Sequence, residues 1–134
     1  MTFEVLLDAG SLRSPDPTFV LPHPWTDDGV AVRGEGTGAH LLHASVALCV
    51  LNDVYREAER LGTPVSGVRV RAAGELDQEA WVSLGITYAV DVDAPAELGG
   101  PLLERVDEVA EVPRVLRAGT TVERETDSRP EGGS

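Results

Sequence analysis

The chain has 134 residues, of which 42% are hydrophobic and 25% are charged, a balance typical of one globular domain. Its formal net charge of -12, from 23 acidic and 11 basic side chains, disfavours binding to nucleic acids and to anionic membranes. No segment approaches the ~20 apolar residues that cross a bilayer, and the N-terminus lacks the features of a signal peptide. The single cysteine excludes an internal disulfide. We therefore expect a cytoplasmic protein.

The N-terminal third is predicted to form short strands separated by turns. Phe3 to Leu7 is apolar apart from Glu4, and Thr18 to Leu21 and Gly29 to Arg33 are bounded by proline, aspartate and glycine. Alternation of large apolar residues with smaller or polar ones in the third segment indicates a sheet with one covered face.

The strongest helix signal follows these strands. Thr37 is a good N-cap residue, and Gly62 is the residue type that most often ends a helix. Leu41 to Leu51 is apolar nearly all round, whereas Asn52 to Leu61 keeps only an apolar stripe. One sheet covers only one side of such a helix, so we expect a second subunit to cover the other side in an obligate homodimer.

Two strands, a second helix and a last strand are predicted after the long helix. Val68 to Ala72 alternates, and Trp81 to Val92 carries six apolar residues with a period of two, which predicts that they share one face. A helix is expected from Ala96 or Pro101 to Ala110, and a short strand near Thr120 to Val122.

The order of these elements predicts an α+β protein with two helices on a mainly antiparallel sheet. Residues 1–124 are expected to form a single domain. Residues 125–134 carry no apolar side chain and are expected to form a disordered acidic tail.

Three motifs in succession resemble the OsmC/Ohr family of cysteine-based hydroperoxide reductases. The apolar, cysteine-containing helix HLLHASVALCVLNDVYREAERLG is followed by GVRVRAAGELD and the strand ITYAVDVDAP, and then by VDEVAEVPRVLRAGTTV. The resemblance covers about Leu41 to Val122. It implies an intertwined homodimer with two central helices and a reactive site near the subunit interface. It also implies reduction of an organic hydroperoxide by a thiolate, without a metal or another cofactor.

The resemblance identifies Cys49 as the peroxide-attacking cysteine, and an N-terminal arginine, Arg13 or Arg33, as its electrostatic partner. The family's second, resolving cysteine would occupy the position of Val112, immediately before Pro113. The glutamate of the family's Asn-Pro-Glu helix start is also absent. Without a resolving cysteine, the sulfenic acid formed on Cys49 must meet an external thiol reductant or over-oxidise.

Two histidines at the start of the long helix admit three interpretations. His40 and His43 lie three residues apart and therefore share a helix face. They are candidates for a metal pair with His23, although two histidines do not complete a zinc site. Alternatively, one of them replaces the missing acidic residue in a ligand pocket, or bonds to the backbone at the helix terminus.

Two functions are therefore expected for a homodimer of this kind. The first is thiol-dependent reduction of an organic hydroperoxide through Cys49 alone, with weak activity. The alternative is a catalytically degenerate OsmC-like dimer that binds a small hydrophobic ligand. For that protein Cys49 is a small buried apolar residue, because burial among apolar side chains raises the pKa of a thiol.

Overall fold

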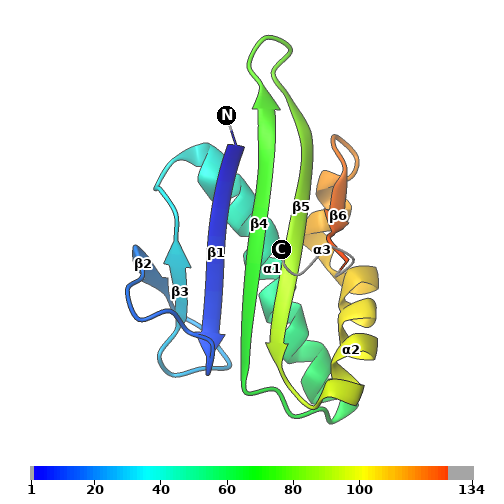
Figure 1. Cartoon of the computed structure of the whole chain (residues 1–134). Coiled ribbons are helices and arrows are strands. Elements are labelled where there is room, and N and C mark those ends of the chain that lie inside the picture. The colour runs from blue at the N-terminus through cyan, green and yellow to red at the C-terminus, as the bar shows by residue number, and fades with distance from the viewer. Residues whose placement is uncertain (1, 127–134) are drawn as a thin grey trace.

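The computed structural model describes residues 2–126, in which six strands form one sheet and three helices lie beside it (Figure 1). The strands are β1 (Thr2–Gly10), β2 (Phe19–Leu21), β3 (Val30–Arg33), β4 (Gly67–Asp77), β5 (Val82–Asp93) and β6 (Val122–Arg124). The helices are α1 (Gly38–Leu61), α2 (Ala96–Val109) and α3 (Glu111–Leu116). The strand order is β2-β3-β1-β4-β5-β6, and only the β5–β6 pair is parallel. The predicted α+β class and the mainly antiparallel sheet are confirmed.

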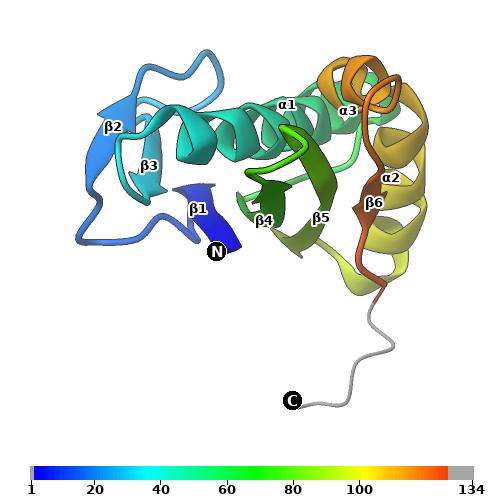
Figure 2. The same ribbon diagram turned by 90° about the horizontal axis from the view of Figure 1, so that it is seen from above.

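The helices lie on one side of the sheet, with α1 running across its centre and α2 beside the β5–β6 edge (Figure 2). Alternate residues of β1 and β4, such as Val5, Leu7, Val70 and Ala72, are buried under α1. In the antiparallel register Val5 lies opposite Ala72, and Leu7 lies opposite Val70. The buried side chains of neighbouring strands therefore form continuous apolar rows that α1 covers.

Both ends of α1 are as the sequence predicts. The hydroxyl of Thr37 accepts a hydrogen bond from the backbone N–H of His40, so it satisfies a donor that the helix itself leaves free. Gly62 has a φ of 71°, the left-handed conformation in which a side chain would be strained. These two signals fix the length of the helix.

The β4–β5 hairpin differs from the prediction. β4 continues to Asp77, and Val82, Leu84 and Trp81 are exposed, Trp81 to 81% of its surface. The register shifts between Gly74 and Leu76, and beyond that bulge the hairpin projects past the helices (Figure 1). Of the six alternating apolar residues of β5, the two nearest the hairpin tip are therefore not covered by a helix.

The segment after β5 contains one helix more than predicted. α2 begins at Ala96 and includes Pro101, and α3 follows directly at Glu111. Pro113 interrupts the sequence pattern, but it is the third residue of α3, where a proline removes no intrahelical hydrogen bond. The predicted last strand begins at Val122 rather than near Thr120.

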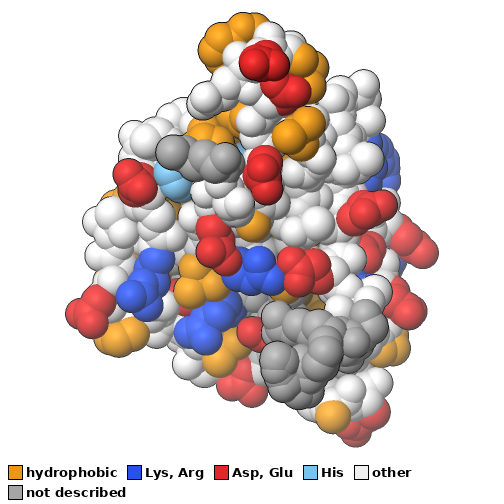
Figure 3. Space-filling view, turned by 45° about the horizontal axis from the view of Figure 1, so that its top comes forward, with side chains coloured by type: hydrophobic (Ala, Val, Ile, Leu, Met, Phe, Trp, Pro, Cys, Tyr) orange, Lys and Arg blue, Asp and Glu red, His pale blue; other side chains and the backbone are white. Residues whose placement is uncertain are grey.

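The opposite face of the sheet carries ion pairs, and no helix of residues 2–126 covers it (Figures 2 and 3). Arg69 contacts the buried carboxylate of Asp8 at 3.0 Å, and Arg71 contacts Glu4 and Glu125 at 3.5 and 2.8 Å. The backbone N–H of Glu125 also donates to the carbonyl of Tyr88, so the first residue of the expected tail is attached to the sheet. Residues 127–134 of that tail lie outside the described residues.

Within residues 2–126, none of the helices has the length and apolar content that crossing a bilayer requires.

Candidate functional site

Cys49 lies in the middle of α1, on the side that faces α3. Its thiol is free and half-buried, at the edge of the apolar core. The Sγ atom lies 3.8 Å from Oδ2 of Asp53, one helical turn further on, and donates its proton toward that carboxylate. Backbone hydrogen bonds from Val112 and Glu111 also reach the sulfur. α1 therefore supplies the thiol and one carboxylate, and the start of α3 supplies the opposing wall.

The surroundings of Cys49 favour the neutral thiol over the thiolate. Burial raises the pKa of Cys49, and the charges of Asp53 and Glu111 raise it further. The backbone hydrogen bonds from Val112 and Glu111 oppose this effect but do not reverse it. Because the thiolate is the form that attacks a peroxide, this electrostatic environment slows the reaction that the family resemblance implies.

The carboxylate of Asp53 is itself perturbed. Its side chain is only 5% exposed, and burial raises its pKa above the ordinary value, while the neighbouring Arg56 guanidinium lowers it. Arg56 forms an ion pair with the other oxygen of the same carboxylate and is therefore not directed at the sulfur. Arg56 thus compensates the charge of Asp53. No positively charged group is among those that shift the pKa of Cys49.

Neither arginine that the sequence suggested as a partner is brought to Cys49. Arg13 lies in the loop after β1, where its backbone N–H bonds to Gly10 and its Nε atom is buried without a hydrogen-bond partner among the described residues. Arg33 is the exposed last residue of β3, opposite Leu6. Across residues 2–126, no hydrogen bond or ion pair joins either guanidinium to the thiol.

The two histidines at the start of α1 both contact Phe3, but they differ in burial. His40 contacts the Thr37 hydroxyl through Nδ1 at 2.6 Å, and its ring meets Phe3 edge-on. His43 is fully buried, its Nδ1–H donates to the carbonyl of Ala39 at 2.7 Å, and its ring stacks on Phe3. Its Nε2 is buried and accepts no hydrogen bond from any described residue. This arrangement places His43 in the core above Gly74 rather than beside Cys49.

His23 does not join the other histidines. Its Nδ1 lies 2.7 Å from the Thr26 hydroxyl and its Nε2 lies 3.0 Å from Oδ1 of Asn52, so both ring nitrogens have partners. The ring also packs against Trp25 and Tyr55. No cluster of three or more potential metal-ligating side chains occurs in the part of the chain that the structure describes.

Several apolar side chains of α1 and α3 are half-buried or exposed, and we call them together the α1–α3 surface. It combines half-buried residues with two strongly exposed ones, Leu41 at 48% and Val115 at 71%. The half-buried members are Leu48, Cys49, Val112 and Leu116. Most of the predicted apolar segment of α1 is already buried within the single chain, and Leu41 is its exposed residue. α2 and α3 both pack against α1, so they cover part of the helix surface that the sheet leaves exposed.

Comparisons with known proteins give a fold but no function. No family model and no curated protein matches the chain. Among solved structures, the crystal structure of a hypothetical protein from Aquifex aeolicus VF5 is similar, with 17% sequence identity and a TM-score of 0.55. The match covers 75% of this chain and 82% of that chain. At this level of identity the similarity concerns the fold alone.

Proposed function

We propose that this chain is an OsmC/Ohr-type protein that forms a homodimer through the α1–α3 surface and binds a small hydrophobic ligand there, without fast redox turnover. The observation that carries the proposal is the environment of Cys49. Its thiol faces the carboxylate of Asp53 and the backbone of Glu111 and Val112. The side-chain charges of Asp53 and Glu111 both raise the pKa of the thiol. A peroxide-attacking cysteine requires the opposite electrostatic environment.

The position of Val112 supports the OsmC/Ohr assignment. In that family a second cysteine condenses with the oxidised first one, so the two residues must be neighbours in space. Here α3 brings Val112 against the sulfur of Cys49, although 63 residues separate them in the sequence (112 − 49). The backbone of Val112 thus lies near the sulfur, as the position of a second cysteine would require. The cytoplasmic location proposed from the sequence fits a lone reduced cysteine.

The exposed apolar side chains support the homodimer. Val115 and Leu41 would remain in water in a monomer, at a cost of roughly 25 cal/mol for each Å² of apolar surface that a partner would cover. Two copies of the α1–α3 surface, packed about a two-fold axis, would bury both residues on each subunit. A ligand site formed between the subunits would then be lined by apolar groups and by the neutral Cys49 thiol.

A slow peroxidase is the second candidate, because the Cys49 thiol is only half-buried and a small peroxide can approach it. In this reaction the thiolate attacks one peroxide oxygen, the O–O bond breaks, and an alcohol leaves after it takes up a proton. Cys49 becomes a sulfenic acid. Two equivalents of an external thiol would then reduce it, releasing water and forming a disulfide between the two external thiols.

The dimer and its ligand site are tested together with Val115→Asp and the matched control Val20→Asp. Val20 is also an exposed valine, at 45%, but it lies on β2. Light scattering should give twice the chain mass of 14.2 kDa for the wild type and the control, and the single chain mass for Val115→Asp. Nile red, an apolar fluorescent probe, should bind the wild type and the control but not the monomeric variant. A monomeric wild type, or unchanged probe binding in Val115→Asp, would refute the proposal.

A further inference from the structure

The outer edge of β5 is only partly paired. β6 pairs with Ile86, Thr87 and Tyr88, and the N–H of Glu125 donates to the carbonyl of Tyr88. From Ala89 to Asp93, that edge has no strand partner among residues 2–126. Since the N–H of Ile86 and the carbonyl of Tyr88 point toward β6, the alternation of a strand directs the backbone groups of Val90 and Val92 to the same edge.

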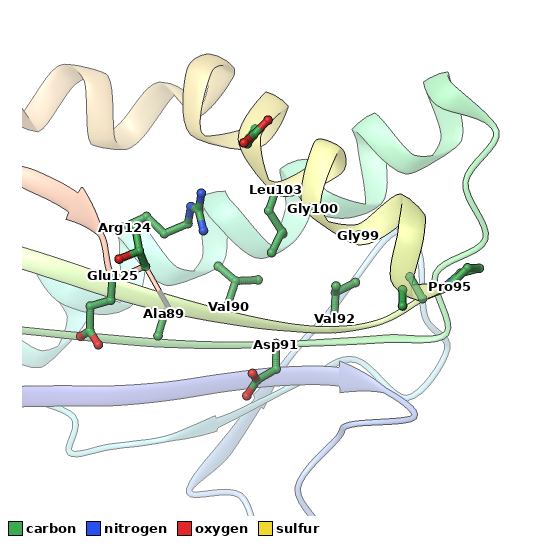
Figure 4. Close-up of a pocket in the computed structure, with 14 residues that line it drawn as sticks. Ala89, Val90, Asp91, Val92, Pro95, Gly99, Gly100, Leu103, Arg124 and Glu125 are labelled. Atoms are coloured by element: carbon green, nitrogen blue, oxygen red, sulfur yellow. The ribbon is translucent and has the colours of Figure 1, made fainter. Parts of the chain in front are cut away.

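A cavity of about 560 Å³ lies between this free edge and α2 (Figure 4). Val90 and Leu103 point toward each other across it and give it an apolar floor. On the wall formed by α2, Gly99 and Gly100 contribute no side chains, and a Cβ atom on Gly100 would meet no other atom within 4 Å. A second chain can therefore approach the edge of β5 without displacing a side chain of this wall.

The charges that line this groove are predominantly acidic. Asp91, Glu104 and Glu125 border it, and Arg124 is its basic lining residue. Arg124 is bound to Asp107 at 2.6 Å, and Arg71 compensates Glu125 at 2.8 Å. Glu104 has no ion-pair partner within the described chain. Asp91 lies opposite Arg69 across the β4–β5 pair, but Arg69 is bound to Asp8, so acidic groups remain in excess along the groove.

We propose that this groove binds an extended, basic peptide segment of a partner protein, which adds to β5 as a parallel strand beyond the end of β6. Backbone hydrogen bonds to Val90 and Val92 would hold the segment, as in other cases of strand addition to a free sheet edge. Successive side chains of the bound peptide would point to opposite faces of the sheet, so they would meet different surroundings. Apolar side chains would lie against Val90 and Leu103, and arginine or lysine would lie beside Asp91.

The test uses the full chain and the peptide acetyl-Val-Arg-Val-Arg-Val-amide. Calorimetry should show saturable binding that weakens as the salt concentration rises, and amide resonances of Val90 and Val92 should shift on titration. The same peptide with glutamate in place of both arginines should bind at least tenfold more weakly. Equal affinity for the two peptides, or resonance shifts that avoid β5, would overturn the proposal.

A variant that fills the groove gives the second arm of the test. Gly100→Leu places a side chain in the open space and should abolish peptide binding while the protein stays folded. Gly36→Leu is the matched control, because a Cβ there also meets nothing within 4 Å and Gly36 precedes α1, away from the groove. Undiminished binding in Gly100→Leu would contradict the proposal. Loss of the wild-type oligomeric state in that variant would assign the groove to a second copy of this chain and overturn it equally.

Discussion

Replacement of Gly74 by alanine should destabilise the protein by an amount that the packing around His43 determines. A Cβ atom on Gly74 would lie 2.5 Å from the carbonyl oxygen of Gly85 and 2.5 Å from Nε2 of His43. The carbonyl belongs to the sheet, and the imidazole is fully buried and bonded to Ala39, so neither group can withdraw freely. Overpacking of this kind costs about 3 kcal/mol at the upper end, and the lower chain entropy of unfolded alanine returns less than about 1 kcal/mol. We expect a net loss of about 2 kcal/mol.

Urea unfolding followed by tryptophan fluorescence measures this loss, at one fixed protein concentration because a dimer's stability depends on it. Gly100→Ala is the matched control, since its Cβ meets open space and an alanine within α2 should stabilise the protein by about 0.5–1 kcal/mol. Adding His43→Ala to Gly74→Ala removes one of the two close contacts and should make the double variant more stable than the sum of the single changes predicts. A Gly74→Ala protein as stable as the wild type would refute the packing of His43 against Gly74.

Three further predictions follow from perturbed groups. Burial lowers the pKa of His23 below its ordinary value, so the folded state binds fewer protons than the unfolded chain. The protein therefore loses stability as the pH falls through about 6.5. His23→Gln should flatten the dependence of unfolding free energy on pH between 7 and 5. Tyr88→Phe removes a buried hydroxyl that donates to Asp107 and should lower the unfolding free energy by about 1.5 kcal/mol in urea titrations; an unchanged midpoint would contradict this. Asp53→Asn removes a charge that raises the pKa of Cys49, so the rate of alkylation by iodoacetamide at pH 8 should rise roughly twofold to fivefold. An equal rate would show that the Asp53 charge does not raise this pKa.

The sequence predicts the fold well because its strongest signals are local. Thr37 and Gly62 fix the ends of α1, and the alternating residues of β4 and β5 identify the central strands without knowledge of their partners. α3 was missed because Pro113 resembles a helix stop, and proline is compatible with the first turn of a helix as well. The exposure of the projecting end of β5 cannot be predicted from the sequence, because it depends on how far the helices extend along the sheet.

The candidate site was predicted only in part. Cys49 was identified, and Asp53 could have been found, because residues four apart on a helix share a face. The contribution of Glu111 could not be found in this way, since it depends on α3 packing against α1. The arginines were proposed without a geometric constraint, and the sheet leaves Arg33 at the exposed end of β3.

The most direct test of the central claim is the rate at which cumene hydroperoxide oxidises Cys49, followed by mass spectrometry across pH with a sulfenic-acid trap. Because burial, Asp53 and Glu111 all favour the neutral thiol, we predict oxidation no faster than that of free cysteine at pH 7, rising only as the pH exceeds the ordinary thiol pKa of about 8.5. Cys49→Ser, which lacks the sulfur, is the control. Fast, saturable trapping at neutral pH that disappears in Cys49→Ser would contradict the account and establish a one-cysteine peroxidase.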